Sequence, residues 1–311
     1  MKYLEKKFSE DNLPSLKEVV FGALELFSEQ KPEKIKFKNF KKRAIIGSGN
    51  AILAGKILFQ NPENIFATEN DFEKILEIEG IDGITILSAS GGKHSSIMAK
   101  FFKEKGYEIE LVTCTENSKT EQIIGRENCV ITKKNPEPYT YNTSTYLGWI
   151  LGVTGENPQE ILEFLTKLED GLGDFDFTKF NGFLFALPSE FGLASGMIDT
   201  KFIELFGRKI SRDIKTFEEL KHACSVVVSE NELLIKFGTE KVLDNLEIYF
   251  NGEELEIQIP ENFGYAGILF LGYFVSGKIQ EQMPDFFRES IGKYVEYLNN
   301  SDFGKGTKIF G

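Results

Sequence analysis

The sequence has few of the residues on which disulfide frameworks and zinc sites depend. Its 311 residues include three cysteines and two histidines, and no two cysteines stand close together. This spacing argues against a structural zinc site, and we expect no metal ion. Cys114, Cys129 and Cys224 lie in apolar stretches. They are therefore expected to be reduced core residues of a cytoplasmic protein.

Long apolar runs and an excess of positive charge are also lacking. No run approaches the about 20 residues that a membrane-spanning helix needs, and residues 1–7 lead into polar sequence rather than a secretory signal. The chain has 36 Lys and Arg against 48 Asp and Glu, a formal net charge of −12. This argues against nucleic acid or an anionic membrane as a partner. The basic cluster at 31–43 is explained better by a solvated linker than by a polyanion site.

The first half of the chain alternates short apolar runs with helical patterns, after a leading helix over 14–29. Strands are expected at 44–46, 64–67, 84–87, 108–113 and 129–131, and helices at 50–60, 70–78, 95–105, 139–153 and 158–168. Strands that alternate with helices predict an α/β fold with a parallel sheet covered by helices on both faces.

The alternation then starts again after residues 169–178, an acidic and glycine-rich segment that we interpret as a linker. Ser189 is the expected N-cap of a long helix. Strands are expected at 182–187, 209–211, 225–229, 233–237 and 255–259, and closing helices at 263–281 and 284–299. The sequence thus predicts two flavodoxin-like, doubly wound modules. The predicted divisions are 1–168, the linker 169–178, 179–282, and a C-terminal helix and tail at 283–311.

The most informative segment is a serine-rich turn (residues 88–96), which joins a predicted strand to a predicted helix. It carries four hydroxyls, two glycines and a lysine where the free N–H groups of a helix start attract anions. A helix cap alone needs one such side chain rather than four, so a phosphate site is favoured. The candidate phosphate ligands here are Ser88, Ser90, Gly91, Lys93 and Ser96.

A second strand–helix junction, at residues 46–51, has glycines on either side of Ser48. Ser48 and Asn50 are further candidate phosphate ligands, although many strand–helix turns look similar. His94 follows Lys93 in the serine-rich turn and is interpreted as a loop histidine beside the phosphate.

Together these residues resemble the sugar isomerase (SIS) domain family. Ser88, Ser90, Gly91 and Ser96 match its serine motif, and the strand at 111–113 matches its next strand. Lys93 stands where the family has a threonine, and Ala51 and Asn142 stand where it has serines. The segment 137–143 resembles the family's Glu…Ser-Thr segment. The resemblance makes Glu137, Asn142 and Thr143 candidate substrate-binding residues.

The second half resembles the second SIS module of glucosamine-6-phosphate synthase and of phosphoglucose/phosphomannose isomerases. The resemblance implies that Glu204 is a catalytic base and that His222 assists ring opening, often from a neighbouring subunit of a homodimer. It also implies a catalytic lysine near the C-terminus: Lys293, with Lys305 and Lys308 as alternatives. From spacing alone, Glu204 could instead form a helix-surface ion pair with Lys201, and Lys293 could be a solvated helix lysine.

The resemblance implies an enzyme that acts on a phosphorylated hexose or amino-hexose. Aldose–ketose isomerisation, or a related deamination or deglycation, needs a carboxylate base for proton transfer through an enediol or enediolamine. Histidine titrates in the range needed for the ring-opening acid. No cofactor is expected, because proton transfer alone accomplishes the reaction. The alternative is a non-catalytic protein that binds sugar phosphates for regulation.

Overall fold

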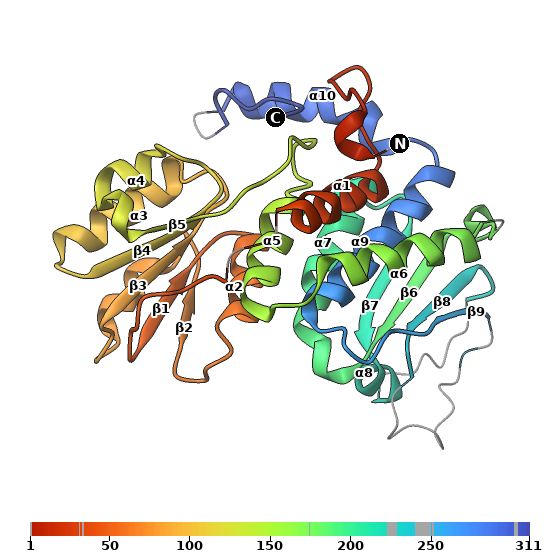
Figure 1. The fold of residues 1–311 in the computed structure, drawn as a ribbon, viewed down its shortest axis with the longest axis horizontal. Helices are drawn as coiled ribbons and strands as arrows, with labels where there is room; N and C mark the ends of the chain where they lie inside the picture. Colours follow the sequence, from red (N-terminus) through yellow and green to blue (C-terminus); the bar gives the residue numbers. More distant parts are fainter. Residues whose placement is uncertain are drawn as a thin grey trace.

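The computed structural model describes residues 2–30, 32, 34–173, 175–222, 229–239, 250, 252–301 and 304–311. Two parallel β-sheets lie side by side, with helices between and around them (Figure 1). The predicted α/β class with two doubly wound modules is confirmed. In the part of the chain that is described, no helix is long and apolar enough to cross a membrane.

The first sheet contains five parallel strands in the order β2-β1-β3-β4-β5. The strands are β1 (Arg43–Ile46), β2 (Ile65–Ala67), β3 (Gly83–Leu87), β4 (Glu108–Thr113) and β5 (Cys129–Ile131). Every residue of β1 and β3 is buried, because helices cover both faces. The strand order reverses between β1 and β3. In open α/β sheets this switch point, at the carboxyl ends of the strands, is where ligands bind.

The helices of the first module follow the predicted order, with two corrections. They are η1 (Tyr3–Glu5), α1 (Leu16–Glu29), α2 (Asn50–Leu58), η2 (Phe72–Glu77), α3 (Lys93–Glu104), α4 (Lys119–Ile124), η3 (Arg126–Asn128), α5 (Thr143–Thr154) and α6 (Pro158–Gly171). The expected helix at 70–78 is only a 3-10 segment, η2. The helix α4 was not predicted, because six residues are too few to show a helical period.

The second sheet repeats this topology with four parallel strands in the order β7-β6-β8-β9. The strands are β6 (Gly182–Leu187), β7 (Ser211–Thr216), β8 (Glu232–Phe237) and β9 (Glu253–Ile257). The predicted strand at 209–211 is wrong, since β7 begins at Ser211. Its polar sequence lacks an apolar run because β7 is an edge strand. The predicted strand at 225–229 lies, apart from Ser229, outside the described residues, as does Cys224.

After β6, the prediction that Ser189 caps one long helix is wrong. A 3-10 segment, η5 (Ser189–Ala194), comes first, and α7 (Ser195–Phe206) follows it. Phe191 has non-helical dihedral angles, φ −101° and ψ 17°, which prevent a continuous helix. A short helix, α8 (Phe217–His222), follows β7 directly.

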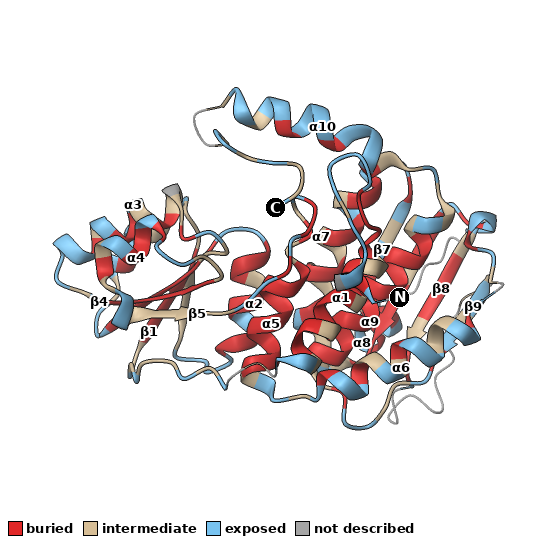
Figure 2. Ribbon diagram, turned by 45° about the horizontal axis from the view of Figure 1, so that its top comes forward, coloured by how far each residue is buried: buried red, intermediate tan, exposed pale blue. Residues whose placement is uncertain are grey.

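The two modules share one core, which is centred on α9 (Tyr265–Gln282). Helices α1, α5, α6 and α7 all pack against α9, whose residues are mostly buried (Figure 2). The helix α10 (Phe286–Asn299) and the C-terminal tail (residues 304–311) then return across the first module. The segment predicted as a linker starts as the end of α6 and contains the fully buried Phe177.

Close packing of α9 against the start of α1 requires a glycine at position 277. A Cβ atom on Gly277 would lie 2.2 Å from the backbone nitrogen of Lys17, so a whole helix would have to shift. We expect Gly277→Ala to lower the free energy of unfolding by about 1–3 kcal/mol, the usual cost of overpacking. Gly292→Ala is the matched control: a Cβ there meets nothing within 4 Å, and the helix gains up to about 1 kcal/mol. Urea unfolding of both variants would check this, and equal stability of the two would contradict it.

Candidate functional site

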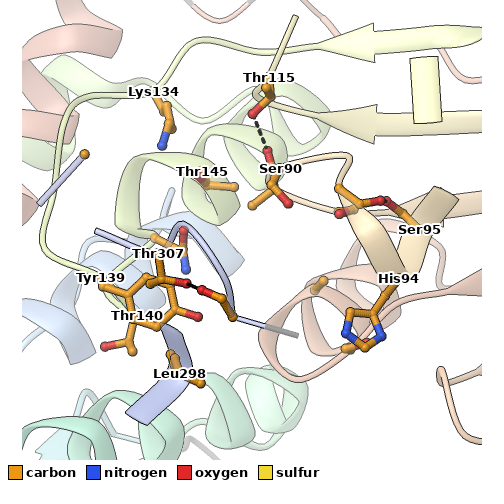
Figure 3. A pocket seen from close by; sticks show the side chains of 18 of the residues that line it. Ser90, His94, Ser95, Thr115, Lys134, Tyr139, Thr140, Thr145, Leu298 and Thr307 are labelled. Carbon is orange, nitrogen blue, oxygen red and sulfur yellow. Dashed lines mark hydrogen bonds between the residues drawn. The ribbon is translucent and has the colours of Figure 1, made fainter. Parts of the chain in front are cut away.

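A cavity of about 780 Å³ lies at the carboxyl edge of the first sheet. Its walls come from the turns after β1 and β3, the end of β4, the connection from β5 to α5, and the C-terminal tail (Figure 3). The cavity thus lies at the switch point between β1 and β3, where open α/β sheets bind ligands. Within the described ranges, no three His, Cys, Asp or Glu side chains gather in a way that could hold a metal ion.

The serine-rich turn forms one wall of the cavity and is fixed by hydrogen bonds to the end of β4. The carbonyl oxygen of Ala89 accepts bonds from the Cys114 amide at 3.1 Å and from the Thr113 hydroxyl at 3.0 Å. The Thr115 hydroxyl donates to the same oxygen at 3.2 Å (Figure 3). Three hydrogen bonds to one carbonyl oxygen fix the turn in the ligand-free protein. A turn that is ordered before binding loses less conformational entropy when a ligand binds, which favours affinity.

The glycine at position 91 is required by this geometry. Gly91 has a φ of +56°, and a Cβ atom on it would lie 2.3 Å from the Ser118 hydroxyl. Its amide donates to the Ser88 hydroxyl at 3.2 Å. Gly91 therefore shapes the turn that presents Ser88 and Ser90 to the cavity.

The first turn of α3 faces the same cavity. Gly92 is its N-cap, and no described side chain caps the helix. The hydroxyl of Ser95 bonds the Gly92 carbonyl at 3.0 Å and the Thr120 hydroxyl at 2.8 Å. The helix start therefore keeps amide groups and its dipole for an anion. The backbone of Lys93 begins α3, but its side chain lies outside the described part of the structure.

Positive charge gathers at the cavity although the whole chain is acidic. Lys134, Lys305 and Lys308 line it, and none of them has a hydrogen bond or ion pair with a described residue. The lining carboxylate Glu69 is paired with His94, with 2.9 Å between Oε2 and Nδ1. Three lysines that have no carboxylate partner among the described residues make this cavity attractive to an anionic ligand.

Glu137 lines the cavity, but its carboxylate is used to hold the start of α5. It accepts bonds from the Thr143 amide at 2.6 Å, from the Ser144 amide at 2.8 Å, and from the Ser144 hydroxyl. Burial raises the pKa of Glu137, and the hydrogen bonds from Ser144 and Thr143 oppose that rise. These contacts fix Asn142, which has a φ of +44° and lines the cavity.

Behind this wall, Glu204 is joined to the cavity through Lys201. The buried ammonium of Lys201 donates to the Thr140 carbonyl oxygen at 2.5 Å and to Glu204 at 2.6 Å. Burial raises the pKa of Glu204, and the charge of Lys201 opposes the rise. The pKa of Tyr146 is raised mainly by burial, and the nearby negative charge of Glu204 adds to the rise. Because Thr140 and Tyr146 line the cavity, the carboxylate lies close behind its wall.

The structure brings together only some of the candidate residues. Those that line the cavity are Ser48, Ser88, Ser90, Glu137, Asn142, Lys305 and Lys308. The described candidates outside the lining are Asn50, Gly91, Ser96, Thr143, Glu204, His222 and Lys293. Asn50 and Thr143 are buried at the starts of α2 and α5. His222 is exposed on α8 of the second module, and Lys293 is exposed on α10.

The sequence argument missed several lining residues. Lys134, Thr115 and Thr145 line the cavity, and so do Tyr139 and Tyr146. The tail reaches the cavity because it pairs with the segment before α5: the Tyr139 amide donates to the Ile309 carbonyl at 2.7 Å. The position of Lys134 just after a strand was an available signal, since parallel strands end at one edge of the sheet.

Comparison with known proteins gives matches in structure only. No protein-family model matches the sequence, and no curated protein matches it. The tagatose-6-phosphate ketose/aldose isomerase of Escherichia coli superimposes with a TM-score of 0.57 at 14% identity, over 92% of this chain and 89% of that one. Glucosamine-6-phosphate deaminase of Thermotoga maritima superimposes with a TM-score of 0.59 at 14% identity, over 90% of this chain and 94% of that one.

A third solved structure similar to this chain is the C-terminal domain of glucosamine-fructose-6-phosphate aminotransferase from Francisella tularensis. Its TM-score is 0.58 at 14% identity, over 88% of this chain and 97% of that domain. All three matches cover both modules. The chain therefore has the two-module fold found in these phosphosugar isomerase, deaminase and aminotransferase structures.

Proposed function

We propose that this protein is an enzyme that binds a phosphorylated hexose or amino-hexose and isomerises or deaminates it. The observation that carries the proposal is the anion site at the switch point. It combines the serine-rich turn with the first turn of α3, which no described side chain caps. It also includes three lysines that have no anionic partner in the described part of the chain. A phosphate monoester carries about −1.5 to −2 charges at pH 7, which suits this combination. The shared fold with phosphosugar enzymes supports it.

The proposed reaction is proton transfer between adjacent carbons of the sugar, with Glu204 as the base. Burial raises the pKa of Glu204, and a base whose pKa is closer to neutrality accepts a substrate proton more readily. Lys201 holds the carboxylate next to the cavity wall. Lys305 or Lys308 would stabilise negative charge on the enediolate oxygen, since both line the cavity. In this proposal the catalytic lysine is therefore Lys305 or Lys308, the two alternatives to Lys293 in the sequence analysis.

The proposal also includes a homodimer and a cytoplasmic location. His222 is exposed on α8, outside the cavity lining of its own chain. Its proposed role in ring opening therefore requires that a second copy bring it to the cavity. Burial raises the pKa of the Cys114 thiol, which favours the reduced, unreactive state expected in a cytoplasmic protein.

Isotope exchange tests the proposed function. The purified protein would be incubated in D2O with fructose 6-phosphate, glucose 6-phosphate or glucosamine 6-phosphate, and deuterium at C1 and C2 would be followed by NMR. We expect exchange with at least one sugar. Ser90→Ala should weaken its binding about tenfold by removing a phosphate ligand, while Ser211→Ala, on the exposed edge of β7, should not. Binding without exchange would favour the non-catalytic regulatory function, and no binding would refute both.

A further inference from the structure

The cavity contains a lysine whose position no motif explains. Lys134 lies on the connection between β5 and α5, three residues after the strand ends. Its side chain lines the cavity and has no hydrogen bond or ion pair with any residue in the described ranges. The adjacent Lys133 differs: its ammonium bonds Gln30, and it is absent from the cavity lining. Two neighbouring lysines thus have different surroundings, and only one faces the candidate ligand space.

A second group in the wall of the same cavity is the buried hydroxyl of Thr145. Thr145 is fully buried on α5 and lines the cavity, yet its Oγ1 atom makes no hydrogen bond at bonding geometry. The Cys114 thiol interacts with this hydroxyl, but a thiol is a weak hydrogen-bonding group and this one is already paired with Thr132 at 3.1 Å. Leaving a buried hydroxyl unsatisfied costs stability. Because this hydroxyl is closed off in the ligand-free protein, a ligand oxygen would become its partner once the Thr145 side chain turns toward the cavity.

Both groups lie beside the serine-rich turn. The Cys114 amide and the Thr115 hydroxyl bond the Ala89 carbonyl, so the end of β4 connects the turn to Thr145 and its neighbours. Figure 3 shows Lys134, Thr145 and Ser90 facing the same part of the cavity. A phosphate held by Ser90 and the start of α3 would therefore have Lys134 on its other side.

We propose that Lys134 and Thr145 form the second half of the phosphate site. Lys134 supplies the countercharge and Thr145 donates a hydrogen bond, opposite the serine-rich turn. The site would then select a doubly charged phosphate ester over uncharged sugars, since the charge of Lys134 would otherwise be unpaired. This assignment deepens the proposed function and rests on its phosphate-binding turn.

Calorimetric titration of four proteins tests the role of Lys134. Wild type, Lys134→Met, Lys134→Arg and Lys133→Met would each be titrated with fructose 6-phosphate, glucose 6-phosphate, glucosamine 6-phosphate and inorganic phosphate at two salt concentrations. A charge-assisted contact predicts that Lys134→Met weakens binding at least about tenfold and lowers its salt dependence. Lys134→Arg, which keeps the charge, should retain most of the affinity. Lys133→Met should stay within about twofold of wild type.

Thr145→Val gives a readout that a structural role would not produce. It removes only the hydroxyl and keeps the shape, so the unliganded protein should be as stable as wild type or more stable. Affinity for inorganic phosphate should nevertheless fall several-fold. A loss of stability with unchanged affinity would overturn the assignment of Thr145.

The outcomes separate this inference from the proposed function. If Ser90→Ala weakens binding but Lys134→Met does not, the phosphate turn stands and the role of Lys134 is refuted. If inorganic phosphate binds in a Lys134-dependent way but no hexose phosphate binds or exchanges, the subsite stands and the proposed function fails. If the wild type binds neither inorganic phosphate nor any of the hexose phosphates, the inference is overturned as well.

Discussion

Glu204→Gln is expected to slow deuterium exchange into a bound hexose phosphate by roughly 10²–10⁴-fold, the usual contribution of a general base. The amide keeps the size of the side chain but cannot accept the substrate proton. Affinity for the sugar phosphate should stay within about threefold of wild type, because the phosphate is held elsewhere. Asp199→Asn is the matched control on the same helix. Asp199 is half-buried, is paired with Arg212 and does not line the cavity, so Asp199→Asn should exchange deuterium at the wild-type rate.

The pH dependence of exchange gives a second readout of the same prediction. Burial raises the pKa of Glu204 above its ordinary value of 4.5, with Lys201 opposing. A base must be deprotonated, so exchange should fall on the acid side at a pH above 4.5. Lys201→Met removes the opposing charge and should move this acid limb to higher pH. An acid limb that stays in place in Lys201→Met, together with normal exchange by Glu204→Gln, would remove Glu204 from the mechanism.

The strands of the first module could be predicted because both faces of the sheet are covered. β1 and β3 are entirely buried, so they appear in the sequence as apolar runs. The edge strand β7, with the sequence Ser-Arg-Asp-Ile-Lys-Thr, has no such pattern and was misplaced. Its position is set by hydrogen bonds to β6, which no local pattern encodes.

The candidate site was predictable where its residues are contiguous. Ser88 and Ser90 share one turn, and their spacing before a helix indicates an anion site directly. Lys134 and Thr145 come from other elements, and only the folded chain brings them to the same cavity. The C-terminal tail likewise reaches the cavity only in the folded chain. Phe310 pairs with Pro138, and this contact places Lys305 and Lys308 in the cavity lining.

Glu137 lies in the wall of the candidate site, but its contacts indicate a structural role. Sequence resemblance predicts a substrate ligand, and the residue does line the cavity. Its carboxylate, however, bonds two backbone amides and a hydroxyl at the start of α5. A carboxylate bonded in this way stabilises a helix through both hydrogen bonds and the helix dipole. We therefore expect that substituting Glu137 mainly lowers the stability of the folded protein.

Glu137→Ala is accordingly expected to lower the free energy of unfolding by about 2–5 kcal/mol. The substitution leaves the amides of Thr143 and Ser144 without an acceptor, and the Ser144 hydroxyl keeps only the bond that it accepts from the Asn135 amide. Urea unfolding would measure the loss, with Glu163→Ala as a control. Glu163 is exposed on α6, and among the described residues its carboxylate bonds only Gln159. Its loss should therefore cost about 0.5 kcal/mol or less. An unchanged midpoint in Glu137→Ala, combined with weaker binding of hexose phosphate, would instead make Glu137 a substrate ligand.

Glu137→Gln extends this prediction to pH. Because burial raises the pKa of Glu137, the folded protein holds that proton more tightly than the unfolded chain. The stabilising contribution of the protonated form is complete below the unfolded pKa near 4.5 and is lost as the pH rises through the higher folded value. Glu137→Gln removes this titration, so its stability should fall less than that of wild type as the pH increases above 4.5. Glu204 titrates in the same direction and is present in both proteins, so the difference between the two curves isolates Glu137.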